Sequence, residues 1–457
     1  MKTHVTNSAI LSAPRIFTRG RLVLFVLGLL VLAATSMAEV TYDSEAGTFT
    51  GYGTYDQAVN ATSNLTATPT FHQETDPETG EPVTIPLTFT NNIVSTGNFT
   101  QTGENLVFGA GTVNSFNALY INNGSGNGAR MTLNGSMTLA ELHMANTKTT
   151  NLDITDGASL SVSGTVRLNE AKNAQGIITQ TGGTVSFTIS DTSGKTTEIR
   201  IGHYPNTGYP SRYNISGGSL SIPNTTTYLA WDGRAEMNIS GGEVSLKGLS
   251  ISNSKDGRGV FTLTGGTFNI GDGGVVRNKR NASSPAAAEV YLGQGTINAT
   301  ATQTWGNNLT ITLTGRSAED TANVEGGVTT FNADTGKAIT IPSVISGVGA
   351  LTKTGAGTLT LSGANTYTGA TTISAGTLEL TGNGTLGTGA ASVASGTTLK
   401  FNYDADKTLA NAISGTGNIV KEGTNKVKLN SAVSYEGNMT INDGRFLCIQ
   451  MEAIRLN

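Results

Sequence analysis

Cysteine is almost absent from this sequence, with Cys448 the only one among 457 residues. No disulfide can therefore form within the chain, so packing must supply its stability. We expect Cys448 to serve as a small inward-facing hydrophobic residue and not as a nucleophile. Runs of strong helix formers are also missing outside residues 22–34, which argues against a helical protein.

The N-terminal segment 1–38 has the pattern of a cleavable signal peptide. Three arginines precede the apolar run 22–34, and Ser36-Met37-Ala38 offers small residues where a signal peptidase needs them. This run is shorter than the roughly 20 residues of a membrane-spanning helix. We therefore predict cleavage after Ala38, export, and no transmembrane segment in the mature chain.

Positive charge is scarce in the predicted mature chain. Loss of residues 1–38 removes four basic residues and no acid, which leaves 24 basic and 32 acidic residues and a net charge of −8. Nucleic acid and anionic lipid are bound through clustered Lys and Arg. The one compact basic run, residues 277–280, has the composition of a solvated loop. We expect no nucleic-acid partner.

Glycine, by contrast, is abundant, with 59 residues. Gly-Gly pairs at 217–218, 241–242 and 265–266 recur at one fixed interval. With this period the apolar residues align in columns, one of which contains Tyr213, Met237 and Phe261. Each unit has the pattern of a strand, a Gly-Gly turn and a second strand, with inward residues at every second position.

These columns predict an all-β fold, a single elongated rod in the form of a right-handed parallel β-helix (a solenoid). Units that stack at the strand spacing of roughly 4.8 Å place residues one period apart directly above each other. A β-sandwich would have strands every 8–12 residues without alignment over the longer period. At about 24 residues per turn, the mature chain forms one continuous coil.

Two copies of one pattern occupy the C-terminal part at a constant offset. Ile345 and Lys353 of the first copy correspond to Ile413 and Lys421 of the second. The first copy, which includes Gly347-Val-Gly-Ala-Leu-Thr-Lys-Thr-Gly-Ala-Gly-Thr-Leu-Thr-Leu-Ser-Gly-Ala-Asn-Thr-Tyr-Thr-Gly369, closely resembles the autotransporter-associated β-strand repeat. The second copy is a degenerate version.

The resemblance implies the passenger part of a type V secreted protein. In that family the repeat belongs to a β-helical stem that assists translocation, and it carries no catalytic residues. The family also implies an outer-membrane translocator as a partner, because complete members have a C-terminal β-barrel. We expect that translocator to be encoded beyond this sequence or on another chain, or the anchor to lie elsewhere.

The patterns divide the chain into five segments, with an acidic proline-bearing loop in the second. They are a signal peptide (1–38), an irregular N-terminal cap with the first turns (39–130), a β-helix with the Gly-Gly ladder (131–275), a β-helix with a loop excursion (276–344) and two autotransporter-associated repeats (345–457).

One pair of motifs suggests chemistry. Asp232-Gly-Arg234 and Asp256-Gly-Arg258 recur at the same interval as the Gly-Gly pairs. Stacked turns would bring the two carboxylates to about 5 Å from each other. Polysaccharide lyases on β-helices use acids for Ca²⁺ and a basic residue for proton abstraction. Asp-Gly is also a common turn pair that a repeat duplicates, and this structural interpretation is favoured.

A cluster of aromatic residues suggests a ligand. Tyr204, Tyr209, Tyr213, Tyr228 and Trp231 lie close together in the sequence. Exposed aromatic rings on a long sheet stack on sugar rings, which makes a glycan or another cell-surface ligand the predicted partner. Tyr213 also belongs to a core column, so part of the set is expected inside.

The histidines give no sign of a metal site. After loss of His4 with the signal peptide, His72, His143 and His203 remain, and none has the spacing of a metal ligand set. We predict no catalytic residue, no cofactor and no metal.

The sequence thus predicts a secreted or cell-surface bacterial protein, a non-catalytic stalk or adhesin. The alternatives are a β-helical polysaccharide lyase or hydrolase that uses Asp232 and Asp256, and a rod that only spaces or helps to secrete other parts.

Overall fold

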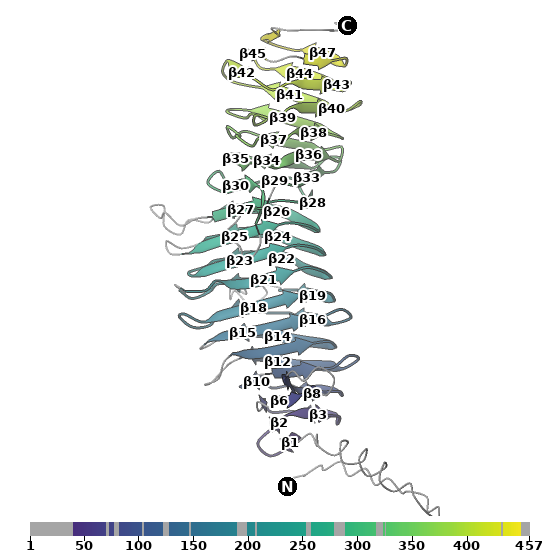
Figure 1. Ribbon diagram of the computed structural model, residues 1–457, viewed down its shortest axis with the longest axis vertical. Helices are drawn as coiled ribbons and strands as arrows, with labels where there is room; N and C mark the ends of the chain where they lie inside the picture. The colour runs from purple at the N-terminus through teal and green to yellow at the C-terminus, as the bar shows by residue number, and fades with distance from the viewer. Residues whose placement is uncertain are drawn as a thin grey trace, which may run out of the picture.

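Strands stack along one axis from residue 40 to residue 448 in the computed structural model (Figure 1). The structure describes residues 40–69, 73–76, 82–102, 105–121, 128–145, 148–189, 199–205, 208–252, 257–277, 288–316, 323–324, 326–430 and 433–448. The predicted signal peptide, His72 and Asp256 lie outside them. Within this described part the secondary structure is strand and turn, with no helix and hence no apolar helix that could cross a membrane.

The first face of the coil is a sheet of parallel strands. Its members are β3 (Gly53–Tyr55), β8 (Leu87–Phe89), β11 (Asn105–Phe108), β13 (Ala129–Leu133), β15 (Thr149–Ile154), β18 (Gln175–Gln180), β21 (Ser211–Ile215), β23 (Arg234–Ile239), β25 (Arg258–Leu263), β27 (Ala288–Leu292), β30 (Thr310–Leu313) and β35 (Ile345–Gly347).

A larger sheet runs along the coil beside the first, and a long strand such as Ser136–Met144 pairs with two separate strands of the next lap. Its members are β1 (Val40–Asp43), β2 (Thr48–Gly51), β4 (Val59–Ala61), β5 (Leu65–Pro69), β9 (Ile93–Ser95), β10 (Phe99–Gln101), β12 (Val113–Ile121), β14 (Ser136–Met144), β16 (Ser159–Val162), β17 (Val166–Leu168), β19 (Thr184–Phe187), β20 (Ile199–Ile201), β22 (Ser219–Leu229), β24 (Glu243–Ile251), β26 (Thr267–Arg277), β28 (Gly295–Ala299), β33 (Val328–Ala333), β36 (Ala350–Thr354), β38 (Thr371–Ile373), β40 (Ala391–Val393), β43 (Ile413–Gly415) and β46 (Val433–Tyr435).

Four smaller sheets complete the described strands. They are β29 (Gln303–Thr304), β34 (Ala338–Ile341), β37 (Thr358–Leu361), β39 (Thr377–Thr381), β41 (Thr398–Asn402), β44 (Asn418–Glu422) and β47 (Asn438–Ile441); β42 (Lys407–Leu409), β45 (Lys426–Leu429) and β48 (Arg445–Cys448); β6 (Gln73–Thr75) with β7 (Pro82–Thr84); and β31 (Gly315–Arg316) with β32 (Asn323–Val324).

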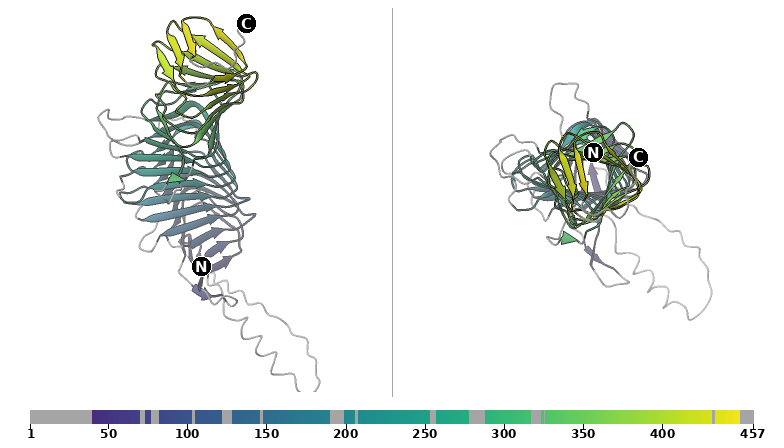
Figure 2. Two further views of the ribbon diagram at one scale, coloured as in Figure 1. Left: turned by 45° about the horizontal axis from the view of Figure 1, so that its top comes forward. Right: turned by 90° about the horizontal axis from the view of Figure 1, so that it is seen from above.

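The interior holds the predicted columns. Met237 is fully buried and lies in parallel register with Tyr213 on one side and Phe261 on the other, both also buried. Seen along the axis, the strands close around this common core (Figure 2). The all-β parallel β-helix is confirmed.

The lap length is not constant along the coil. The interval predicted from the Gly-Gly pairs separates Tyr213 from Met237 and Met237 from Phe261. Laps in the C-terminal part are shorter, since Leu351 is already in register with Thr371. The longer laps also carry the longest strands, Ser219–Leu229 and Thr267–Arg277.

The N-terminal end differs from a simple continuation of the coil. β1 pairs with β2 in the antiparallel direction, and the ring of Tyr42 stacks on Phe49 at 4.4 Å. Parallel pairing begins directly after this hairpin, between β2 and β5. Residues 77–81 of the acidic loop predicted in this region lie outside the described residues, and the strands on either side of them, β6 and β7, form an antiparallel pair.

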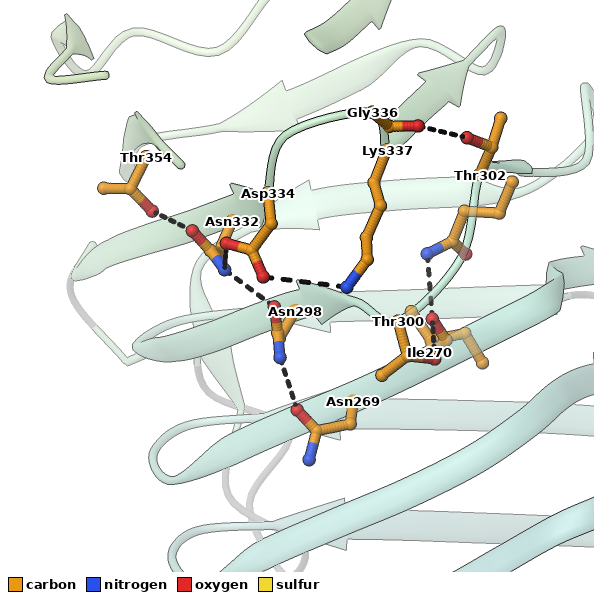
Figure 3. Close-up of polar contacts among 11 residues, drawn as sticks. Asn269, Ile270, Asn298, Thr300, Thr302, Asn332, Asp334, Gly336, Lys337 and Thr354 are labelled. Carbon is orange, nitrogen blue, oxygen red and sulfur yellow. Dashed lines mark hydrogen bonds and ion pairs between the residues drawn. The ribbon is translucent and has the colours of Figure 1, made fainter. Parts of the chain in front are cut away.

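A ladder of side-chain amides runs over the outer face where long laps give way to short ones (Figure 3). Asn332 donates from Nδ2 to Oδ1 of Asn298 at 2.7 Å, and Asn298 donates to Oδ1 of Asn269 at 2.9 Å. The Thr354 hydroxyl donates to Oδ1 of Asn332, and Asn269 donates to the carboxylate of Glu243 at 2.6 Å. In each of these hydrogen bonds the donor lies on the C-terminal side and the acceptor one lap nearer the N-terminus, and the last acceptor is the carboxylate of Glu243. Hydrogen bonds in such a chain polarise one another, so each strengthens the next.

Candidate functional site: a corner patch on the outer surface

One corner of the coil is made by the same backbone conformation in five successive laps. The residue after each strand has a positive φ, between 57° and 76°, at Ala145, Asn169, Gly202, Ala230 and Ser252. This conformation costs an alanine or serine roughly 1–2 kcal/mol. Strain of this kind collects at functional sites, which directs attention to the side chains around this corner.

A column of outward side chains precedes the corner. Tyr120, His143, Arg167, Arg200 and Tyr228 are consecutive register partners on β12, β14, β17, β20 and β22. Their immediate neighbours along each strand are buried core residues, so alternation directs these side chains outward. Adjacent members lie about 4.8 Å apart at the backbone.

A second column follows the corner and interlocks with the first. Glu170, His203 and Trp231 each come three residues after a member of the first column. Arg200 donates from Nη1 to Nδ1 of His203 at 3.1 Å, and its guanidinium lies 3.7 Å from the centre of the Trp231 ring, one lap further on. We call these two columns, with Glu141, Tyr204 and Tyr209, the corner patch.

The lower part of the corner patch is a charged hydrogen-bond network. His143 Nδ1 lies 2.6 Å from Glu170 and Nε2 lies 3.0 Å from Glu141. Burial opposes protonation of His143, but the hydrogen bonds and charges of Glu170 and Glu141 outweigh it and raise the pKa of the imidazole. Burial likewise opposes ionisation of Glu170, and the hydrogen bond and positive charge of His143 prevail and lower the pKa of that carboxyl. Both shifts favour the ion pair between the His143 imidazolium and the Glu170 carboxylate.

The upper part of the corner patch is different. Burial, together with the charges of Arg200 and Arg167, lowers the pKa of His203 to about 4. His203 is therefore neutral at physiological pH. Because its Nδ1 accepts from Arg200, the ring keeps its proton on Nε2, which is a donor.

A loop after β20 carries the exposed aromatic rings. The buried side chain of Asn169, one lap below, accepts from the backbone N–H of Tyr204 at 2.7 Å and donates to its carbonyl at 3.1 Å. Gln175 donates to the carbonyl of Pro210 at 2.7 Å. These bonds hold Tyr204 and Pro210 against the previous lap, and Tyr204 and Tyr209 have 42% and 74% of their surface exposed.

The predicted aromatic set is thus divided by the structure. Tyr213 is in the core, and Trp231 is only 9% exposed beneath Arg200 with its edge against Tyr228. Tyr204 and Tyr209 are exposed, and Tyr228 is half-buried. The arginines and His143 of the same surface were not singled out in the sequence, because the laps between them have unequal lengths.

The structure does not describe both Asp-Gly-Arg motifs in full, so it does not show whether Asp232 and Asp256 form a site. Asp256 lies outside the described residues, so the predicted carboxylate column remains a prediction. Arg234 and Arg258 are register partners on the first face. Arg258 binds Glu289 through two hydrogen bonds of 2.9 and 3.1 Å, a structural use of this arginine.

No group of three or more His, Cys, Asp or Glu that could hold a metal occurs in the part of the chain that the structure describes. Cys448 is half-buried on β48 and packs against the core cluster, as predicted for a small hydrophobic residue. Corner-patch charges are engaged with each other, and the exposed tyrosines are held on a docked loop. This arrangement suits recognition of a ligand by contact.

The comparisons with known proteins agree with the C-terminal resemblance. Searches of curated proteins and of solved structures found no match. The family model of the passenger-associated-transport-repeat matches residues 351–380, which span β36 to β39. Residues 351–380 are therefore a passenger-associated transport repeat, in agreement with the resemblance of the first C-terminal copy.

Proposed function

We propose that this chain is an exported passenger-type stalk that displays the corner patch at a bacterial cell surface and binds a glycan there without turning it over. The repeat at 351–380 and the β-helical coil support a passenger role. The signal-peptide pattern of residues 1–38 supports export.

The observation that carries the binding proposal is the loop after β20. Two tyrosines lie open to solvent, and the backbone of one of them, Tyr204, is held by the fully buried Asn169. A tyrosine ring offers both an apolar face and a polar hydroxyl to a ligand, and a backbone that is held in place loses little entropy when a ligand binds. Rings presented in this way stack on sugar faces.

The test is a binding assay of the mature chain on immobilised neutral and acidic polysaccharides. The double variant Tyr204→Ala/Tyr209→Ala should lose binding at least about tenfold, as two lost ring contacts predict. Tyr291→Ala, which removes a ring from the outer side of the first face, serves as the control and should bind like wild type. Binding that survives the double variant, or no binding to any polysaccharide, contradicts this function.

No observation among the described residues favours the polysaccharide-active alternative over binding. The same assay separates the two, because an enzyme would release shortened products. A rod that only spaces or helps to secrete other parts would bind none of the polysaccharides.

A further inference from the structure

A groove lies on the outer surface where the pairing of the long strands β22, β24 and β26 is interrupted. Strand β24 has one residue, Lys247, between its two paired segments, whereas β22 has residues 223–225 and β26 has residues 271–273 in the corresponding place. Pro223, Lys247 and Asp272, which come from these three interruptions, all line the groove, and its volume is about 490 Å³. A volume of this size is within the range of small-molecule sites.

The lining of the groove is largely held in place before any ligand arrives. Asn269 belongs to the amide ladder, in which it donates to Glu243 and accepts from Asn298. The hydroxyl of Thr300 donates to the carbonyl of Ile270 at 3.2 Å (Figure 3). A lining that is already ordered loses little entropy when a ligand binds. The apolar part of the lining is supplied by Pro223, Leu246 and Ala301.

Two side chains of opposite charge line this groove without being paired. Lys247 and Asp272 are both exposed, and as far as the structure describes the chain, neither makes a hydrogen bond or an ion pair. Opposite charges on neighbouring laps pair directly elsewhere on the coil, as Arg130 does with Asp153 at 2.7 Å. The groove therefore offers a ligand one cation and one anion that no other described side chain uses.

We infer that the groove binds a short peptide in its zwitterionic form, with the carboxylate at Lys247 and the ammonium at Asp272. An ammonium such as that of Lys247 donates to a carboxylate, and the carboxylate of Asp272 accepts from an ammonium. A ligand with a single charge, or with none, would leave one of the two side chains without a charged partner. The groove shares no residue with the corner patch, so this site goes beyond the proposed function.

The test compares peptides that differ in one charge. Calorimetry measures the affinity of the mature chain for trialanine, for N-acetyl-trialanine and for trialanine amide. We expect trialanine to bind at least about tenfold more tightly than either blocked form, since each block removes one charged hydrogen bond. Equal affinities for the three peptides, or no binding of trialanine, would overturn the inference.

Matched variants locate the site and the orientation of the peptide. Lys247→Gln should weaken trialanine about tenfold but leave trialanine amide unchanged, because the amide lacks the carboxylate that Lys247 binds. Asp272→Asn should likewise weaken trialanine and leave the N-acetyl form unchanged. Lys172→Gln and Asp404→Asn make the same charge changes at exposed positions outside the groove and should bind trialanine like wild type.

A further variant fills the groove without changing its charge. Ala301→Phe places a ring among the lining residues and should abolish trialanine binding. Thermal unfolding of each variant shows whether the coil is intact. If Ala301→Phe unfolds, the two charge variants and their controls decide the question.

Two other results overturn the inference in distinguishable ways. If maltotriose binds at least as tightly as trialanine and Lys247→Gln weakens both, the groove is a saccharide site. If trialanine binding survives Lys247→Gln and Asp272→Asn but is lost in Tyr204→Ala/Tyr209→Ala, the peptide binds at the corner patch and not in the groove.

Discussion

Lys353 and Lys421 occupy the same position in the two C-terminal repeats, yet they lie on different sheets of the coil. Lys353 is on β36 of the largest sheet and Lys421 is on β44 of a smaller one. In the coil, the residue that lies in register with Leu351 three laps later is Ile413. In the sequence pattern of the second repeat, the residue that corresponds to Leu351 is instead Ile419. The second copy is therefore turned by one face relative to the first.

Both lysines are fully buried and are used in the same way. Lys353 Nζ donates to the carbonyls of Thr354 and Gly355 at 2.6 and 2.7 Å, and to Ala375 of the next lap at 3.2 Å. Lys421 Nζ donates to the carbonyls of Glu422, Gly423 and, again in the next lap, Asp443. Each lysine side chain thus links the turn after its own strand to the turn of the next lap, although the two lysines lie on different sheets.

Replacement of Lys353 by methionine should lower the free energy of unfolding by about 2–3 kcal/mol. Methionine fills a similar volume but leaves buried carbonyl oxygens without their donor. Lys337→Met is the matched control, since Lys337 makes only a 3.7 Å surface pair with Asp334 (Figure 3) and should cost about 0.5 kcal/mol or less. Denaturant unfolding compares the two, and equal effects would contradict a structural role for the buried ammonium.

The two described histidines should titrate far apart. His143 should gain its proton above pH 6.5, and His203 only near pH 4. NMR titration of the imidazole signals measures both directly. A common midpoint near 6.5 would show that the corner patch does not have the contacts described above.

These shifts also predict how stability depends on pH. As the pH falls from about 6.5 to 4, the unfolded chain takes up a proton at His203 that the folded chain refuses, so His203 lowers the free energy of unfolding. His143 acts in the opposite sense: its stabilisation is complete below 6.5 and is lost as the pH rises through its raised pKa. His203→Gln should remove the first slope, and His143→Gln the second.

The amide ladder gives a third prediction for stability. Asn298→Ala breaks two ladder bonds and leaves Asn269 Oδ1 and Asn332 Nδ2 without this partner, which should cost about 1–2 kcal/mol. Asn117→Ala removes a single, exposed bond of 2.9 Å to Asn98 and should cost clearly less. If denaturant unfolding gives the two variants the same stability, the ladder adds nothing beyond a surface hydrogen bond.

A further prediction concerns export. Expression of the full sequence in a bacterium should yield a mature chain that starts at Glu39, because cleavage is expected after Ala38. Intact mass and N-terminal sequencing of the secreted or surface fraction measure this. A chain that retains residues 1–38 and stays in the cytoplasm would contradict the export part of the account.

The core of the coil could be predicted from the sequence because its pattern repeats at a fixed spacing. The column of Tyr213, Met237 and Phe261 has one residue per lap at equal intervals. The corner patch has no such regularity, because the step in sequence from Arg167 to Arg200 is longer than the step from His143 to Arg167. A search at constant period cannot find a column whose laps differ in length.

The burial of the two lysines could have been predicted from the alternation of inward and outward residues. Lys353 follows Leu351 at the inward spacing of every second residue, and Lys421 follows Ile419 in the same way. Alternation therefore placed both lysines inside. What the sequence could not supply was the partner for the charge, since three carbonyls from two laps converge only after the coil has closed.

The most direct test of the coil is the surroundings of one methyl group. With methyl-labelled methionine, the nuclear Overhauser effects of Met237 report which rings lie within a few ångströms of it. The stacking of successive laps predicts contacts to the rings of both Tyr213 and Phe261, which come one lap before and one lap after it. A Met237 methyl that contacts neither ring, or is solvent-exposed, would contradict the coil and the corner patch built on it.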